Sequence, residues 1–183
     1  MTASQHVETC TPMPGRVPTF EQIYDEYFEF AWTNLRRLGV RGADLEDAVQ
    51  GLFIVVHRRL GQFAGRSSLK TWLAGIAWRV ASEHRRHESR KGGALPLPED
   101  LQSRDRDPHR AAVHAEALRL LDRVLGQLDD DKRAVFVLAE LEQMSVPEIA
   151  EALSVNLNTV YSRLRAARRE FNQALQLHRG RER

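Results

Sequence analysis

Cysteine is nearly absent, because the chain of 183 residues contains only Cys10. A single cysteine excludes an intramolecular disulfide and a cysteine-based zinc site, and it fits a reducing compartment. Long hydrophobic runs are also missing, since no apolar stretch approaches the roughly 20 residues that a membrane helix needs. Residues 1–18 lack the apolar core of a signal peptide. We therefore expect a cytoplasmic protein with no membrane insertion.

The net charge is small as well, since 27 Lys and Arg against 25 Asp and Glu leave +2. The charges are nevertheless sorted along the chain. Residues 61–92 and residues 156–183 each contain seven Lys and Arg against two acids, whereas residues 113–155 contain four against nine. Residues 19–40 contain two against four. Two basic blocks beside acidic ones indicate partners more clearly than the total charge does.

Patterns of catalytic chemistry are lacking too. We find no metal-ligand spacing, no phosphate-binding loop and no nucleophile paired with a base. His84, His87, His109 and His114 are scattered through basic or linker sequence, where we expect them to face solvent. The chain is therefore not expected to be an enzyme, to use a cofactor or metal, or to act on a small-molecule substrate.

Helical periodicity is present along most of the chain, and the alternating pattern of a strand is not. The sequence predicts an all-α fold of two small helical domains joined by a flexible linker. Two glycines and three prolines mark the linker; its roughly 19 residues would typically span about 25 Å and could extend to on the order of 60 Å. The predicted parts are a disordered tail at 1–18, a first domain at 19–91, the linker at 92–110, a second domain at 111–176 and a basic tail at 177–183.

Capping residues predict where several helices begin. Thr19 with Gln22, and Ser145 with Glu148, have the spacing of a capping box. Asp44 is expected to be the N-cap of the second helix. These signals divide the periodic segments into separate helices of ordinary length.

The segment 144–171 has the layout of a helix-turn-helix: a short capped helix, a tight turn and a long helix. In this motif the start of the second helix enters the major groove. Candidate base and phosphate contacts there are Asn158, Thr159, Tyr161, Ser162 and Arg165. The alternative is an ordinary helical hairpin with a solvated basic face, and for Tyr161 a surface ring packed on its own helix is an equal alternative.

The first basic block follows several aromatic residues. Phe63, Trp72 and Trp78 lie near it, and aromatic rings beside a basic groove suit stacking on unpaired bases. A flipped base also needs a loop pocket with hydrogen-bonding groups. A solvated helix face is the ordinary alternative for the basic run, and the spacing of Trp72 favours the core.

These motifs together resemble a known family. The stretch from Asp44 to Lys91, with D-x-E-D-x-x-Q-x-x-F and F-x-G-x-S-S-x-x-T-W-L, resembles region 2 of the extracytoplasmic-function (ECF) sigma factors of bacterial RNA polymerase. The stretch from Leu120 to Phe171, with T-V-x-S-R-L-x-x-A-R, resembles their region 4. The resemblance covers roughly residues 19–90 and 113–172 in the family's order.

The resemblance implies a role for each motif. Asp47, Gln50 and Phe53 match positions that dock on the clamp helices of the polymerase β′ subunit; helix capping and core packing are the ordinary alternatives. In region 4, Ser162, Arg165 and Ala166 match positions that face minus-thirty-five bases, and Arg163 one that contacts phosphate. The residues implied in minus-ten binding are the base-pocket positions Arg59, Phe63 and Arg79, the loop positions Gly65, Ser67 and Ser68, and the strand-backbone positions Lys70, Arg85, Arg86 and Arg90.

Three positions depart from the family pattern. Arg79 stands where a small amide is usual, Asn158 stands where the turn often has glycine, and Ala166 replaces a commonly basic residue. The changes at Arg79 and Ala166 predict an unusual promoter preference.

We therefore expect an ECF sigma factor that binds core RNA polymerase through β′, and through β as well, and that reads promoter DNA. Many members of the family are also held by an anti-sigma factor. The rival prediction is a conventional helix-turn-helix repressor or activator that does not bind core polymerase.

Overall fold

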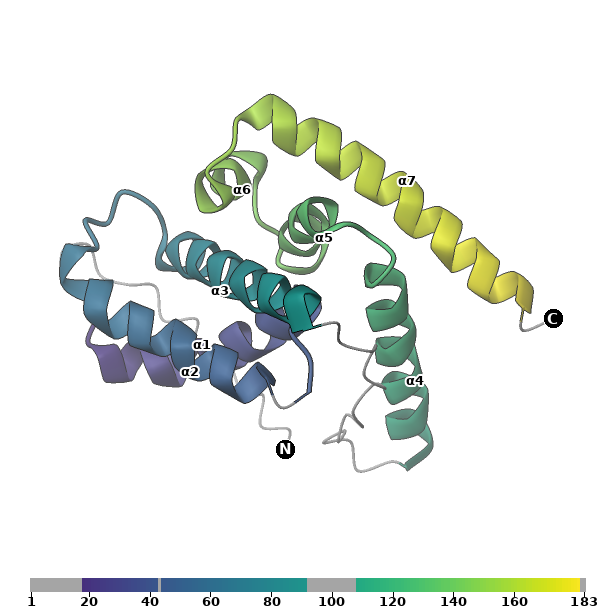
Figure 1. Cartoon of the computed structure of the whole chain (residues 1–183), viewed down its shortest axis with the longest axis horizontal. Coiled ribbons are helices and arrows are strands. Elements are labelled where there is room, and N and C mark those ends of the chain that lie inside the picture. The colour runs from purple at the N-terminus through teal and green to yellow at the C-terminus, as the bar shows by residue number, and fades with distance from the viewer. Residues whose placement is uncertain (1–17, 43, 92–107, 182–183) are drawn as a thin grey trace, which may run out of the picture.

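The computed structural model describes residues 18–42, 44–91 and 108–181, and within these ranges the chain is helical with no strand. The predicted all-α class is confirmed (Figure 1). The elements are α1 (Phe20–Arg37), α2 (Asp44–Arg59), the 3-10 turn η1 (Leu60–Gln62), α3 (Leu69–Lys91), α4 (Pro108–Leu125), α5 (Asp130–Phe136), the π-helical turn η2 (Val137–Leu141), α6 (Val146–Leu153) and α7 (Leu157–Arg181).

Both predicted capping boxes are confirmed. The backbone N–H of Thr19 donates to Gln22 Oε1 at 3.0 Å, and the N–H of Gln22 donates to Thr19 Oγ1 at 3.4 Å. Ser145 and Glu148 close the second box at the start of α6. Asp44 differs from the prediction by one position, because it is the first residue of α2 rather than the residue before it. Its carboxylate still lies in the first turn, where the helix dipole favours negative charge.

Two helices run past the predicted boundaries. Helix α4 begins at Pro108, inside the predicted linker, since proline is tolerated at the first helical position, where no backbone donor is needed. Helix α7 continues to Arg181, through most of the predicted basic tail. The predictions for 1–17 and for 92–107 lie outside the described residues.

The first half is a bundle of α1, α2 and α3, which pack pairwise on one another. Its centre is filled by residues with almost no exposure, including Ile23, Leu35, Leu52, Val56 and Ala77. Helix α1 ends at Arg37 with Leu38 as its C-cap, and Gly39 follows with φ +100°, a left-handed conformation that glycine adopts without strain.

The second half is built on α5 and α7, with α6 packed beside them. Buried Arg133 on α5 donates to the carbonyls of Leu125 and Leu128, which satisfies acceptors at and just after the end of α4. Burial, and then the nearby charge of Arg85, lower the pKa of Arg133. Ser154, at φ +56°, ends α6 in a left-handed cap and turns the chain toward α7.

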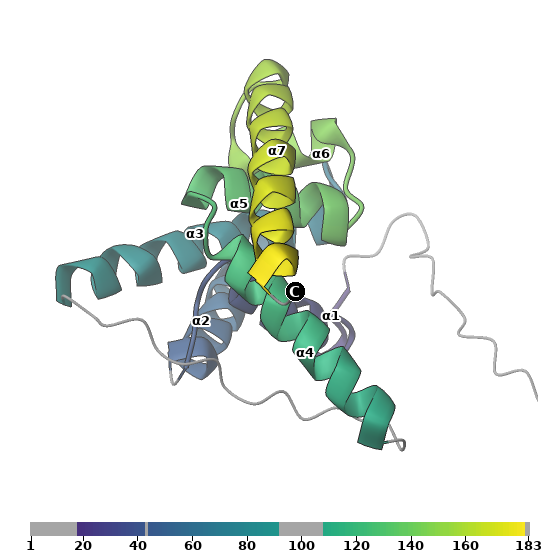
Figure 2. The ribbon, with the colours of Figure 1, turned by 90° about the vertical axis from the view of Figure 1, so that its right-hand side faces the viewer.

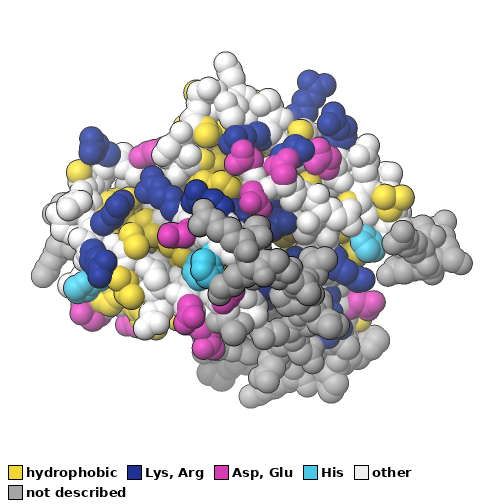
Figure 3. All heavy atoms as spheres, in the orientation of Figure 1, with side chains coloured by type: hydrophobic (Ala, Val, Ile, Leu, Met, Phe, Trp, Pro, Cys, Tyr) yellow, Lys and Arg dark blue, Asp and Glu magenta, His cyan; other side chains and the backbone are white. Residues whose placement is uncertain are grey.

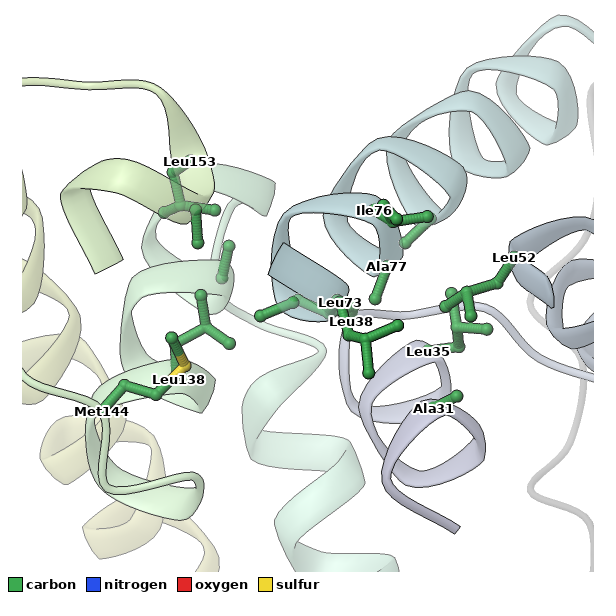
Figure 4. Packing of buried hydrophobic residues seen from close by; sticks show 14 of the residues in the cluster. Ala31, Leu35, Leu38, Leu52, Leu73, Ile76, Ala77, Leu138, Met144 and Leu153 are labelled. Carbon is green, nitrogen blue, oxygen red and sulfur yellow. The ribbon is translucent and has the colours of Figure 1, made fainter. Parts of the chain in front are cut away.

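The two halves share one hydrophobic core, which the sequence did not predict. Helix α3 of the first half packs against α6 of the second. In Figure 4, Leu38 and Leu73 of the first half lie between Leu35 of the same half and Leu138 of the second half. Helix α7 lies on the side of the molecule away from α1 and α2 (Figure 2). The predicted DNA-reading helix therefore sits at the outside of a closed body.

Candidate nucleic-acid interface

The start of α7 is organised by Asn156, which directly precedes the helix. Its Oδ1 accepts hydrogen bonds from the backbone N–H of Thr159 at 2.7 Å and from the Thr159 hydroxyl at 2.9 Å. The Ser162 hydroxyl donates to the Thr159 carbonyl at 3.0 Å. The donors of Thr159 and Ser162 are thus used within the helix, and their oxygens remain as acceptors.

The predicted recognition residues share the surface of this first turn and the next. Asn158, Tyr161, Ser162 and Arg165 are exposed, with Tyr161 at 59%. Thr159, Arg163 and Ala166 are half-buried. On the opposite face Val160, Leu164 and Ala167 are buried. The polar face is therefore free to enter a groove while the apolar face holds the helix in place.

Ion pairs link α7 to the helical segment before α6. Arg163 pairs with Asp131 of α5, and Arg168 pairs with Glu140 of η2 at 2.6 Å. Lys132 of α5 contacts Glu170 at 2.8 Å. Arg163 is therefore held near the start of α7, where a phosphate would compete with Asp131 for its guanidinium.

The residues predicted to line the base pocket of the first half lie at the surface. Arg59 and Arg79 are exposed, and Phe63 is half-buried against Trp72, with ring centroids 5.1 Å apart. Trp72 packs against the hydrophobic core, as its spacing indicated. Of these two rings, Phe63 is the one predicted to line the base pocket, and Trp72 packs against it.

The loop beside the pocket is ordered by its own hydrogen bonds. Gly65 has φ +63°, so a larger residue would be strained there. The Ser68 Oγ accepts from the backbone N–H of Thr71 at 3.0 Å and lies 2.8 Å from the Thr71 hydroxyl. Ser68 therefore caps α3, which is a structural role beside the predicted contact with DNA. Ser67 is half-buried.

The predicted strand-backbone cations are divided between solvent and internal partners. Arg86 is exposed, with its Nε donating to the Ser82 carbonyl at 3.1 Å. Lys70 and Arg85 contact acids of the second half, at 3.3 Å from Glu142 and 2.9 Å from Asp130. Basic and acidic side chains meet near the middle of the face in Figure 3. The side chain of Arg90 lies outside the described residues.

A groove between α1 and α2 contains two of the three predicted polymerase contacts, Gln50 and Phe53, whereas Asp47 is not part of its lining. The groove has a volume of about 540 Å³. Gln50 and Asp47 are exposed, whereas Phe53 is only 4% exposed, because it packs among the aromatic rings of α1. Phe53 thus forms the floor of the groove and offers little surface to a partner.

Two exposed apolar residues of this groove were not predicted from the sequence as contacts. Tyr24 is 41% exposed and Ile54 is 45% exposed, and both line the groove. The sequence signal for this exposed surface was Ile54, an apolar residue that lies outside the buried stripe of α2. Tyr24 has the helical spacing of the apolar residues of α1, and periodicity alone does not tell a core residue from a groove residue.

These features define a class: an all-helical protein with a helix-turn-helix in one half and a basic, aromatic-lined surface in the other. The family model described as Sigma-70 region 2 matches residues 23–91, and the family model described as Sigma-70, region 4 matches residues 118–171. The chain belongs to the ECF group of RNA polymerase sigma factors.

Named relatives support this assignment. The RNA polymerase sigma-H factor of Pseudomonas aeruginosa is 30% identical over 146 residues, which cover 73% of this chain and 74% of that protein. The ECF sigma factor SigX of Bacillus subtilis is 31% identical over 140 residues, covering 74% and 72%. The ECF sigma-E factor of Escherichia coli K12 is 30% identical over 147 residues, covering 75% and 76%.

Solved structures share the fold. CnrH in complex with the cytosolic domain of CnrY aligns with a TM-score of 0.65 at 23% identity, covering 86% of this chain and 88% of that one. The sigma factor RpoE of Bartonella quintana in complex with the anti-sigma factor NepR aligns with a TM-score of 0.69 at 19% identity, covering 86% and 96%. In the part of the chain that is described, no helix combines the length and apolar character needed to cross a bilayer.

Proposed function

We propose that this protein binds core RNA polymerase and directs promoter-specific transcription initiation. The observation that carries the proposal is the presence of both sigma regions, 2 and 4, in order in one chain. A conventional helix-turn-helix regulator needs the second of these regions for DNA binding and has no use for the first. The protein acts in the cytoplasm, where the polymerase is.

The polymerase-binding surface in this proposal is the α1–α2 groove and its rim. Asp47 and Gln50 supply exposed polar contacts, Ile54 and Tyr24 supply exposed apolar area, and buried Phe53 supports them. An apolar groove with a polar rim suits a helical partner such as the β′ clamp helices. In this proposal, the β subunit of the polymerase and an anti-sigma factor also bind the protein.

The two DNA surfaces have different tasks. The start of α7 reads duplex DNA at the minus-thirty-five element, where Arg165 faces a base and Arg163 a phosphate. In the first half, Arg59, Phe63 and Arg79 receive a base flipped from the minus-ten element. The loop at residues 65–68 and the cations Lys70, Arg85, Arg86 and Arg90 hold the unpaired strand.

The test that separates this proposal from its rival uses purified core polymerase and a set of upstream duplexes from the source genome. The proposal expects the chain to co-purify with core enzyme and to bind duplex DNA weakly when alone. A chain that fails to bind core enzyme but binds one duplex specifically and tightly would be a conventional repressor or activator.

A further inference from the structure

Two large apolar side chains are exposed at the start of α7, where the helix-turn-helix layout places the contact with DNA. Leu157 is 48% exposed and Tyr161 is 59% exposed. Leu157 is the first residue of the helix and was not predicted from the sequence as a contact. Residues four apart on a helix are neighbours on its surface, with Cβ atoms about 5–6 Å apart. The two side chains therefore form one apolar patch.

This patch of Leu157 and Tyr161 is separate from the packing of α7. Packing uses another face of the helix, on which Val160 is 0% exposed and Leu164 is 6% exposed. Apolar surface left in water has a free-energy cost that grows with its area. Single exposed apolar residues are ordinary on a protein surface, but two placed together on the polar face of a DNA-reading helix indicate a ligand with apolar groups.

The hydroxyl groups beside the patch offer acceptors and no donors. The Ser162 hydroxyl donates to the Thr159 carbonyl at 3.0 Å, and the Thr159 hydroxyl donates to Asn156 Oδ1 at 2.9 Å. Both hydroxyl protons are used at the start of the helix, so each oxygen presents lone pairs only. Lone pairs are repelled by phosphate oxygens and bind amino groups. In the major groove those amino groups are N6 of adenine and N4 of cytosine.

An A·T base pair presents the groups that this surface suits. In the major groove adenine offers its N6 amino group, and thymine offers an apolar C5 methyl group. Asn158, which follows Leu157 directly, is exposed, and an asparagine amide can bind N6 and N7 of adenine together. A G·C pair offers the cytosine amino group to a hydroxyl but has no methyl group for the apolar patch. The two kinds of group together therefore favour A·T pairs.

From these contacts, and resting on the function proposed above, we propose that the patch of Leu157 and Tyr161 reads thymine methyl groups in the minus-thirty-five duplex. The two side chains pack on the methyl groups, while Asn158 and the Ser162 hydroxyl bind the amino group of adenine. Arg165 lies about 12 Å further along the helix axis than Leu157 and faces a different base pair. The patch thus contributes sequence preference without contributing charge.

A thymine methyl group can be deleted from DNA while the hydrogen-bonding groups of the base are kept, because deoxyuridine differs from thymidine only at C5. Burying one methyl group is worth about fourfold in a binding constant at 25 °C. Contacts to phosphates and to the polar edges of the bases are kept when uracil replaces thymine. This replacement therefore isolates the contact proposed for Leu157 and Tyr161 from the polar contacts of α7.

The test uses the protein bound to core polymerase, because the free chain is expected to bind duplex DNA weakly. The preferred minus-thirty-five duplex is selected from a randomised library, and each of its thymines is then replaced in turn by uracil. Fluorescence anisotropy measures the affinity of wild type, Leu157→Ala and Tyr161→Ala for each duplex. Leu177→Ala is the matched control, since Leu177 is 68% exposed near the other end of α7.

Wild type should lose about fourfold in affinity when uracil replaces one or two particular thymines. The loss at each of these thymines should vanish in Leu157→Ala or in Tyr161→Ala, according to which side chain contacts that methyl group, and should persist in Leu177→Ala. Tyr161→Phe keeps the ring and should keep the loss. A selected duplex without a methyl-sensitive thymine, or a loss that persists in both alanine variants, would overturn the inference.

The remaining outcomes are also decisive. Disappearance of the loss in Tyr161→Phe would show a contact of the hydroxyl and would overturn the ring contact. If Leu157→Ala weakens binding to core enzyme and leaves DNA binding unchanged, the patch is a protein contact and the inference is wrong. Circular dichroism verifies that the variants keep their helical content.

Failure of this inference is distinct from failure of the proposed function. A chain that binds core enzyme and selects a duplex, but binds uracil and thymine duplexes equally, defeats only the reading of methyl groups. A chain that never binds core enzyme defeats the function itself.

Discussion

At the start of α6, a single carboxylate stabilises the helix-turn-helix. Glu148 Oε2 accepts from the Ser145 hydroxyl at 2.7 Å and from the Ser145 backbone N–H at 2.9 Å. These hydrogen bonds, the side-chain one first, lower the pKa of Glu148 below its ordinary value of 4.5. Because the folded-state pKa is lowered, the stabilisation is complete above pH 4.5 and is lost as the pH falls through the folded-state value.

The first prediction follows from this capping box. Ser145→Ala should lower the free energy of unfolding by about 1 kcal/mol at neutral pH. Glu148→Gln should be less sensitive to acid than wild type below pH 4.5, since it has no carboxylate to protonate. Urea unfolding across an acidic pH series measures both effects. An acid sensitivity identical to that of wild type in Glu148→Gln would show that this carboxylate does not contribute.

The second prediction concerns Arg79, exposed on α3 where the family usually has a small amide. Arg79→Asn should change the preferred minus-ten base by about tenfold in relative initiation, since one good base contact is worth about 1–3 kcal/mol. Binding to core enzyme should not change, because Arg79 lies outside the α1–α2 groove. Initiation from a library of randomised minus-ten elements measures the preference, and an unchanged base profile would contradict the assigned role.

At the scale of the element, α7 combines a buried apolar face with an exposed polar start. Arg165→Ala should weaken minus-thirty-five duplex binding by about tenfold or more and relax the preference at one base pair. Arg169→Ala removes the same charge from an exposed position further along α7 and is the matched control. Fluorescence anisotropy with the polymerase-bound protein measures the affinity of both variants for the minus-thirty-five duplex. Equal losses in the two variants would indicate a charge effect alone.

The groove between α1 and α2 yields the next prediction. Ile54→Ser should weaken binding to core enzyme by about tenfold, because it removes exposed apolar area beside Gln50. Leu177→Ser is the control, since Leu177 is 68% exposed on α7, outside the groove. Competition with a labelled sigma factor for core enzyme measures the affinity. Similar weakening in both variants would place the polymerase contact elsewhere.

The elements were predictable because their signals are local. Capping residues such as Thr19 and Ser145 placed the starts of helices, and periodicity placed their buried faces. Boundaries near Asp44 and Pro108 shifted by a few residues, since several positions in a first turn satisfy similar rules. The motif spacing placed the proposed recognition residues on α7, and they lie together because they are neighbours along one helix.

At the scale of the whole molecule, the close packing of the two halves was not predictable from local patterns. The pairs of Lys70 with Glu142 and of Arg85 with Asp130 join residues far apart in the chain. Charge sorting showed that acids and bases were segregated but not which would meet. Core packing of Phe53 was expected from its spacing on α2, but its partners, the aromatic rings of α1, were not, because they are tertiary contacts.

The proposed function assigns polymerase binding to the first half and the reading of duplex DNA to the second. Its central claim is most directly tested by run-off transcription with purified core enzyme on upstream regions of the source genome. The account predicts that adding the protein yields discrete promoter-specific transcripts that core enzyme alone does not make. The absence of any such transcript on every upstream region, together with failure to bind β′, would contradict it.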